Sequence, residues 1–238
     1  MRRIIYMIKK YLARQHGRSN LGWLQSLFHF SFADYYNPRR VNFGALRVIN
    51  DDLVKPQTGF EMHPHRDMEI VSYVIDGELT HGDSMGNKNT ISRGHIQYMS
   101  AGTGIFHSEH NWGEVTSRFL QIWIVPEQKN LKPQYGDYKY DWELRKNKLL
   151  HLVSPPGGGA AVELAADANF YALELDAGLT YEFPIAPGRQ AYLVQVEGKS
   201  DINGVELEPK DGVESVEETL RIKAVEQSHV VIIEMKKP

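Results

Sequence analysis

The chain has 238 residues, of which 42% are hydrophobic, and its net charge is −3. This length allows one large β domain or two domains of about 100–150 residues, and the small net charge gives no reason to expect a nucleic-acid partner. The chain contains no cysteine, which excludes disulfides, thiolate metal sites and a cysteine nucleophile. Because no apolar run approaches the ~20 residues of a membrane span, and because the absence of cysteine suits a reducing compartment, we expect a cytoplasmic protein.

The N-terminal segment is basic. Residues 1–33 carry six basic side chains and no acidic one, namely Arg2, Arg3, Lys9, Lys10, Arg14 and Arg18. We expect a solvated strand or arm that lies on the acidic remainder of the chain. The alternative is an arm that touches an acidic surface of a protein partner.

Strand-like segments dominate the first half of the chain. Segments rich in β-branched and aromatic residues lie at 41–49, 69–75, 91–99 and 119–125, with turn residues between them. Residues 126–148 are polar, contain Pro133 and Gly136, and lack a clear period, so we predict an inter-domain connection there with a short helix near 142–146.

Strand patterns resume in the second half at 170–175, 179–183, 191–197, 220–225 and 229–235. Asn203-Gly204 lies between two short apolar runs and favours a type I′ hairpin turn. Many short strands without a long helix predict an all-β chain of two antiparallel barrels or jelly rolls. We divide it into residues 1–130, with the N-terminal arm, and residues 131–238.

Two short runs contain side chains that bind metals, His63-Pro64-His65 and His107-Ser108-Glu109. Alternate residues of a strand point to the same face. We therefore expect two strands that face each other inside a barrel and direct three imidazoles and one carboxylate at one point, which is a ligand set for a divalent transition metal. The glycines of residues 101–104 allow a tight turn before His107.

Other residues near these runs are weaker candidates. Glu69 is a rival carboxylate ligand, because its even offset from His63 and His65 gives it the same face if no bulge intervenes. We expect His81 to be structural, His110 to have the wrong parity for the barrel interior, and Asn111 to hold a loop. The second half contains no His-x-His run in the corresponding strand at 179–183 and has His229 alone, so we expect no metal there.

The first half also resembles the pirin family, and within it the bacterial pirin-like proteins with two cupin domains. The resemblance begins near residue 17 and is most specific across 30–112. The matching runs are His63-Pro64-His65-Arg66-Asp67-Met68-Glu69, His81-Gly82-Asp83-Ser84-Met85-Gly86-Asn87, Gln97-Tyr98-Met99-Ser100-Ala101-Gly102-Thr103-Gly104 and His107-Ser108-Glu109. Gln57 departs from the family pattern, where a glycine is often found, and this puts the local loop shape in doubt.

The resemblance implies an all-β bicupin, with two tandem cupin-type antiparallel barrels and one metal in the N-terminal barrel. In the pirin pattern the ligands are His63, His65, His107 and Glu109, which favours Glu109 over Glu69. The family's metal is commonly iron, so we expect Fe(II), while this ligand set also suits Mn, Co, Ni, Cu or Zn.

Pirins and their bacterial relatives are associated with quercetin 2,3-dioxygenase activity, in which O₂ opens the ring of a flavonol and carbon monoxide is released. The resemblance therefore implies a flavonol or similar aromatic enol as substrate, with Glu109 as the catalytic residue that transfers a proton. We take Phe60, Tyr73 and Phe106 as candidates for an apolar pocket wall.

Two other functions fit the same residues. The first is an iron-binding, redox-responsive protein that meets a protein partner without turnover, and the basic arm is the sequence feature that favours it. The second is a non-oxidative cupin isomerase. Quercetin consumption under air and under nitrogen separates these functions from the dioxygenase.

Overall fold

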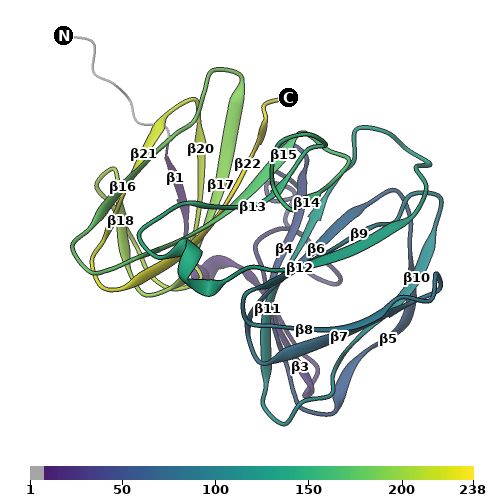
Figure 1. Cartoon of the computed structure of the whole chain (residues 1–238). Helices are drawn as coiled ribbons and strands as arrows, with labels where there is room; N and C mark the ends of the chain where they lie inside the picture. The colour runs from purple at the N-terminus through teal and green to yellow at the C-terminus, as the bar shows by residue number, and fades with distance from the viewer. Residues whose placement is uncertain (1–7) are drawn as a thin grey trace. The chain divides into compact units, whose positions relative to one another are not determined.

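The computed structural model describes residues 8–238 (Figure 1). Arg2 and Arg3 of the basic arm lie outside the described residues. Strands dominate, and the helices of the described part are two short 3₁₀ helices, η1 (Ala13–Gln15) and η2 (Trp142–Arg145). The predicted all-β class and the short helix near 142–146 are confirmed. Neither helix is long and apolar enough to cross a membrane.

The chain forms two compact units. Unit 1 contains the described part of Met1–His16 together with Glu143–Val153 and Ala168–Pro238, and unit 2 contains Gly17–Trp142 and Ser154–Asp167. The chain therefore leaves and re-enters each unit. The division between residues 130 and 131 stays a prediction.

Unit 2 contains a large and a small antiparallel sheet. The large sheet has the strand order β12-β9-β6-β11-β4-β3-β2, and the small sheet has the order β5-β10-β7-β8. The strands of the large sheet are β2 (Gly17–Asn20), β3 (Leu24–Phe28), β4 (Leu46–Val54), β6 (Glu69–Asp76), β9 (His95–Ser100), β11 (Ser117–Ile124) and β12 (Gln134–Lys139). Those of the small sheet are β5 (Thr58–His65), β7 (Glu78–Asp83), β8 (Lys88–Ser92) and β10 (Ile105–Asn111), and the short β14 (Val162–Glu163) also belongs to this unit.

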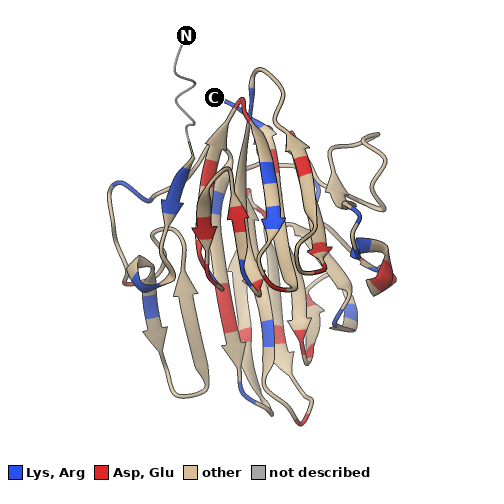
Figure 2. Cartoon of the chain, turned by 90° about the vertical axis from the view of Figure 1, so that its left-hand side faces the viewer, with Lys and Arg blue, Asp and Glu red and all other residues tan. Residues whose placement is uncertain are grey.

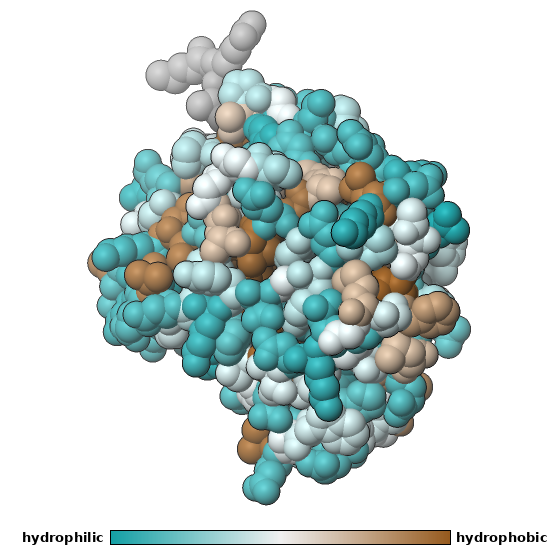
Figure 3. All heavy atoms as spheres, turned by 45° about the vertical axis from the view of Figure 1, so that its right-hand side comes forward, coloured by the Kyte–Doolittle hydropathy of each residue, from teal (hydrophilic) through white to brown (hydrophobic). Residues whose placement is uncertain are grey.

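The core of unit 2 lies between its two sheets. Leu79 and Ile91 of the small sheet pack with Val54, Val74 and Phe119 of the large sheet, and all five are fully buried. Burial of such side chains stabilises the barrel by about 1.5–3 kcal/mol each. On one face of the molecule, Figure 3 shows separate hydrophobic patches among mostly hydrophilic side chains.

Unit 1 repeats the plan of a larger and a smaller sheet. Its larger sheet has the order β1-β20-β17-β22-β15-β13, and its smaller sheet the order β16-β21-β18-β19. The strands are β1 (Lys9–Tyr11), β13 (Leu150–Ser154), β15 (Ala168–Leu175), β16 (Thr180–Pro184), β17 (Arg189–Glu197), β18 (Ser200–Ile202), β19 (Val205–Leu207), β20 (Gly212–Val216), β21 (Thr219–Ala224) and β22 (Ser228–Lys236). The predicted hairpin is confirmed, because β18 pairs with β19 and both Asn203 and Gly204 have positive φ.

The described part of the basic arm lies on acidic residues of the chain itself. Strand β1 pairs antiparallel with β20, and basic and acidic segments lie side by side there (Figure 2). Lys10 Nζ lies 2.9 Å from Asp211 Oδ2, and the Tyr11 hydroxyl donates to Glu214 over 2.7 Å. For these residues, the expected placement against the acidic remainder of the chain is confirmed.

Candidate metal centre

The two metal-binding runs lie on neighbouring strands. Strand β10 pairs antiparallel with β5, and His107 is the direct cross-strand partner of His63. The expectation that the two strands face each other across the barrel is therefore wrong. Alternation fixes which residues share a face, but neighbouring and opposing strands satisfy it equally well.

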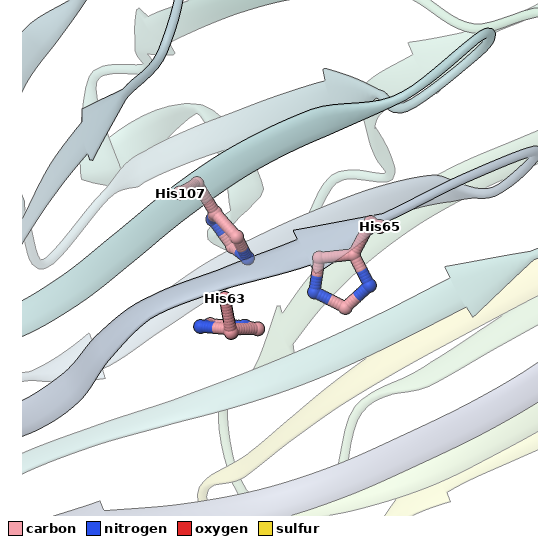
Figure 4. A group of neighbouring side chains, drawn as sticks. All are labelled: His63, His65 and His107. Atoms are coloured by element: carbon pink, nitrogen blue, oxygen red, sulfur yellow. The ribbon is translucent and has the colours of Figure 1, made fainter.

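The three imidazoles converge on one point (Figure 4). One ring nitrogen from each of His63, His65 and His107 lies within 4.8 Å of the others. The ring centroids are 4.4 Å apart for His63 and His107 and 4.9 Å apart for each pair that includes His65. These distances place three nitrogen ligands around a volume of the size that a single cation needs.

The ring nitrogens are arranged as metal ligands require. His63 Nδ1 lies 2.7 Å from the Glu61 backbone oxygen, so Nδ1 is the protonated nitrogen and Nε2 keeps its lone pair. His107 is 1% exposed, and neither of its ring nitrogens has a hydrogen-bond partner among the described residues. A buried imidazole without partners is costly in free energy, and a bound metal ion would satisfy the nitrogen that carries the lone pair.

The protonation state of the cluster also suits a metal. Burial, followed by the proximity of His107 and His63, lowers the pKa of His65 to about 3. Burial, followed by the proximity of His63 and His81, lowers the pKa of His107 to about 3. Both rings are therefore neutral at neutral pH, which is the form that binds metal ions.

Glu109 lies beside the histidines and is anchored by the large sheet. Its Oε2 accepts a hydrogen bond from Gln121 Nε2 over 2.7 Å, and its Oε1 accepts from Ser72 Oγ over 3.0 Å and from Gln97 Nε2 over 3.3 Å. The group whose ligand atoms all lie within 4.8 Å comprises the three histidines and does not include this carboxylate. Metal ligation by Glu109 therefore stays a prediction.

Glu69 lies in a different sheet. The chain turns between β5 and β6 with Asp67 at a positive φ of 46°, so the even spacing from His65 no longer implies a shared face. The Glu69 carboxylate accepts hydrogen bonds from Ser100 Oγ over 2.6 Å and from the Ala165 backbone over 3.2 Å. Burial raises the pKa of Glu69.

The weaker candidates have structural contacts. His81 is fully buried, its Nε2 lies 2.9 Å from Asp83, and its ring stacks on Tyr135. His110 stacks on Trp112. Asn111 Nδ2 donates to the backbone oxygens of Val54 and Val115 over 2.9 and 2.8 Å, which confirms its predicted role in holding a loop.

Two further residues have defined surroundings. His229 is buried in unit 1, and its Nδ1 lies 3.0 Å from Glu197. Gln57 adopts a positive φ of 58°, a backbone conformation that favours glycine, and its side chain donates to the backbone oxygen of Trp112 over 2.6 Å.

A cavity of about 300 Å³ opens on the three histidines and Glu109. Its apolar wall is formed by Leu21, Leu24, Phe28, Phe32, Phe60 and Trp123. The placement of Phe60 in the pocket wall is confirmed. The other two predicted wall residues lie elsewhere. Tyr73 is buried, but it alternates with Ser72 and Val74 on β6 and therefore faces away from the barrel interior, and Phe106 is 52% exposed on the outer face of β10.

The residues that hold Glu109 and close the cavity were not predicted from the sequence. Gln121 interrupts an otherwise apolar strand, Phe119-Leu120-Gln121-Ile122, and a buried polar residue of this kind requires a partner. That interruption was an available signal. Trp123 follows Gln121 by two residues, which places both on the same face.

Both halves of the chain match known protein families. The pirin family model matches residues 10–124, and the model of the quercetinase C-terminal cupin domain matches residues 151–235. A pirin-like protein of Caulobacter vibrioides is 41% identical over 92% of this chain and 95% of its own length. The quercetin 2,3-dioxygenase of Escherichia coli K12 is 39% identical over 98% of this chain and 99% of its own length.

The solved structures give the same assignment. The crystal structure of the bacterial pirin YhhW from Escherichia coli in complex with nickel(II) superposes with a TM-score of 0.92, at 36% identity over 98% of this chain and 100% of that one. The bicupin fold is thereby confirmed. Likeness over nearly the full length, in both sequence and structure, shows that the chain belongs to the pirin family.

Proposed function

We propose that the protein is a metal-dependent dioxygenase that opens the ring of a flavonol such as quercetin with O₂ and releases carbon monoxide. The main support is the convergence of three imidazoles on the wall of an apolar cavity. The reaction class is also supported by the Escherichia coli relative, which is named quercetin 2,3-dioxygenase. Flat aromatic ligands match a cavity whose wall contains three phenylalanines and a tryptophan.

His63, His65 and His107 are the proposed metal ligands, with Glu109 as the fourth. We propose Fe(II) as the native metal, with Mn, Co, Ni, Cu and Zn as alternatives that metal analysis of the purified protein distinguishes. A bound divalent ion of this kind acidifies an enol hydroxyl and supports electron transfer to O₂.

Glu109 is the proposed proton acceptor for the substrate hydroxyl. Its carboxylate lines the cavity and is fixed by Gln121, Ser72 and Gln97, so its orientation is set before a ligand enters. The aromatic side chains Phe60 and Trp123 hold the ligand rings and exclude water from the reacting atoms.

The experiment is a quercetin assay on the metal-loaded protein under air and under nitrogen. We expect consumption of quercetin with release of carbon monoxide under air, and neither under nitrogen. His107→Ala should abolish turnover. His151→Ala is the matched control and should retain it, because His151 lies in unit 1 against Asn169 and Tyr171.

The other outcomes decide against this function. Tight metal binding without turnover under air favours the redox-responsive interaction protein. Conversion of an enol substrate under nitrogen favours the isomerase.

A further inference from the structure

We propose that Asn50 determines ligand specificity, by forming a hydrogen bond to a polar group on the part of the ligand that lies away from the metal-binding atoms. This inference rests on the proposed function and names a feature of its substrate, namely a hydroxyl on the pendant ring of an aromatic enol. It is built from a row of buried polar side chains that crosses the large sheet of unit 2.

The row follows directly from the strand register. Gln121 of β11 is the cross-strand partner of both Asn50 on β4 and Ser72 on β6. Ser72 is in turn opposite Gln97 on β9, and Gln97 is opposite Asp137 on β12. Directly opposite residues lie on the same face of a sheet, so these five side chains form one line.

This face is the inner one. Gln121, Ser72 and Gln97 all donate hydrogen bonds to Glu109, which belongs to the small sheet across the barrel. Asn50 has the same strand parity as Val54, which lies in the core between the two sheets. Asn50 therefore points into the barrel, and it lines the same cavity as the three histidines.

Asn50 differs from the other members of the row in its hydrogen bonding. Gln121, Ser72 and Gln97 are satisfied through Glu109, and Asp137 accepts from Tyr135 over 3.2 Å and from Asn89 over 2.8 Å. Asn50 is 3% exposed, and its Oδ1 has no hydrogen-bond partner among the described residues. A buried amide oxygen without a partner destabilises the ligand-free protein, and such a group calls for an explanation.

A ligand would supply the missing partner. A hydroxyl both donates and accepts, so it satisfies Asn50 whichever way the amide is turned. A second unpartnered polar atom lies on the same face, because Trp123 Nε1 is buried without an acceptor among the described residues, and the indole ring contacts His65 edge to face. Both atoms belong to residues that line the cavity together with Phe28, Phe32 and Phe60, which favours a flat aromatic ligand with an additional polar group.

The position in the row defines which part of the ligand Asn50 meets. Asn50 lies one strand beyond Gln121, and adjacent strands are about 4.8 Å apart. Gln121 contacts Glu109 at the candidate metal centre, whereas the neighbour of Asn50 on its other side is Phe28 of the apolar wall. A ligand bound at the histidines therefore meets Asn50 with a distal group.

The experiment measures anaerobic binding of two flavonols to the metal-loaded protein. Quercetin carries hydroxyls on its pendant ring, and galangin lacks them. We expect the unmodified protein to bind quercetin about three- to tenfold more tightly than galangin. Asn50→Leu should abolish this preference by weakening quercetin binding while leaving galangin binding unchanged.

Two readouts distinguish recognition from a structural role. The melting temperature of Asn50→Leu should equal or exceed that of the unmodified protein, because leucine removes a buried polar atom that has no partner. Gln190→Leu is the matched control, since Gln190 is a buried amide of unit 1 whose Nε2 also has no partner among the described residues, and it should keep the preference. Asn50→Ala is a second variant that should lose the preference for quercetin over galangin.

The possible failures are distinguishable. A preference for quercetin that survives in Asn50→Leu and Asn50→Ala overturns the role of Asn50 and leaves the proposed function standing. Equal affinity for both flavonols in the unmodified protein also overturns the role of Asn50 and leaves the proposed function standing. Binding of neither flavonol by the metal-loaded protein removes the proposed function and this inference with it.

Discussion

His107 and His110 lie three residues apart on β10, so they point to opposite faces of the small sheet. His107 is fully buried at the candidate metal centre, whereas His110 stacks on Trp112 and lies 3.2 Å from the exposed Glu61. Their nearness in the sequence makes both histidines candidate metal ligands. Strand alternation places only His107 on the face that carries the candidate metal centre.

This pair provides a matched test of the metal centre. We expect His107→Ala to weaken binding of Ni(II) or Fe(II) by more than about 100-fold, because loss of a ligand should exceed the 10- to 100-fold effect of losing an outer partner. His110→Ala should bind within about twofold of the unmodified protein. Isothermal titration calorimetry measures both, and equal losses in the two variants would remove His107 from the ligand set.

Gln121 provides a second test at the residue scale. Gln121→Leu removes the shortest of the three hydrogen bonds to Glu109. We expect the free energy of unfolding to fall by about 1–3 kcal/mol, because a buried carboxylate loses a donor, and kcat for quercetin to fall by more than about tenfold with a smaller change in KM. Urea denaturation and steady-state kinetics check the two parts. An unchanged kcat would show that the orientation of Glu109 is not needed for turnover.

At the scale of the strand, a bulge in β5 arranges the site. His63 is opposite His107 and Phe60 is opposite Glu109, so β5 has two residues, Glu61 and Met62, where β10 has one. Both extra positions are exposed, while Phe60 and His63 face the cavity despite their odd spacing. In a regular strand the backbone oxygen of Glu61 would lie in the plane of the sheet, whereas here it lies 2.7 Å from His63 Nδ1.

Deletion of Met62 tests the function of this bulge. The shortened strand can alternate regularly and keep Phe60 and His63 on the inner face, but the Glu61 oxygen then loses its contact with His63. We expect metal affinity to fall by about 10- to 100-fold, as for other lost partners of ligating histidines. Met62→Ala is the control and should bind normally, since the side chain is exposed. Normal affinity in the deletion variant, measured by the same titration, would contradict the role of the bulge.

The strand scale also explains which parts of the site were predictable. Alternation in His63-Pro64-His65 and His107-Ser108-Glu109 correctly placed each pair on one face. It did not identify the two strands as neighbours, because that depends on pairing between distant segments. Glu69 would share a face with His63 and His65 only if β5 continued as far as Glu69. The turn at Asp67 ends β5 before that point.

At the scale of the molecule, the strand content was predictable from local composition, but the pairing between distant strands was not. The basic arm pairs with β20, about 200 residues along the chain, and local patterns do not specify such contacts. The polar row on the large sheet is assembled from five strands in the same way. Phe106 illustrates the limit for pocket residues, because an aromatic side chain in a strand fits a wall and an outer face equally well.

The stability of the metal-free protein should depend on pH through the histidine cluster. The pKa of His107 is lowered to about 3 by burial, and in the unfolded chain it is about 6.5. Between these values the unfolded chain binds a proton that the native state does not, so acidification favours unfolding. The contribution is fully present above about pH 6.5 and is lost as the pH falls toward about 3, with a slope of at most about 1.4 kcal/mol per pH unit.

His107→Gln isolates this contribution, because glutamine does not titrate. We expect the free energy of unfolding, measured in urea at about pH 7 and about pH 5 without metal, to fall less on acidification in the variant than in the unmodified protein. Saturating metal at about pH 7 should stabilise the unmodified protein by about 2.7 kcal/mol at 100 times the dissociation constant, and the variant much less. Parallel pH profiles would mean that His107 binds a proton equally in the native and unfolded states. The lowering of its pKa by burial would then be excluded.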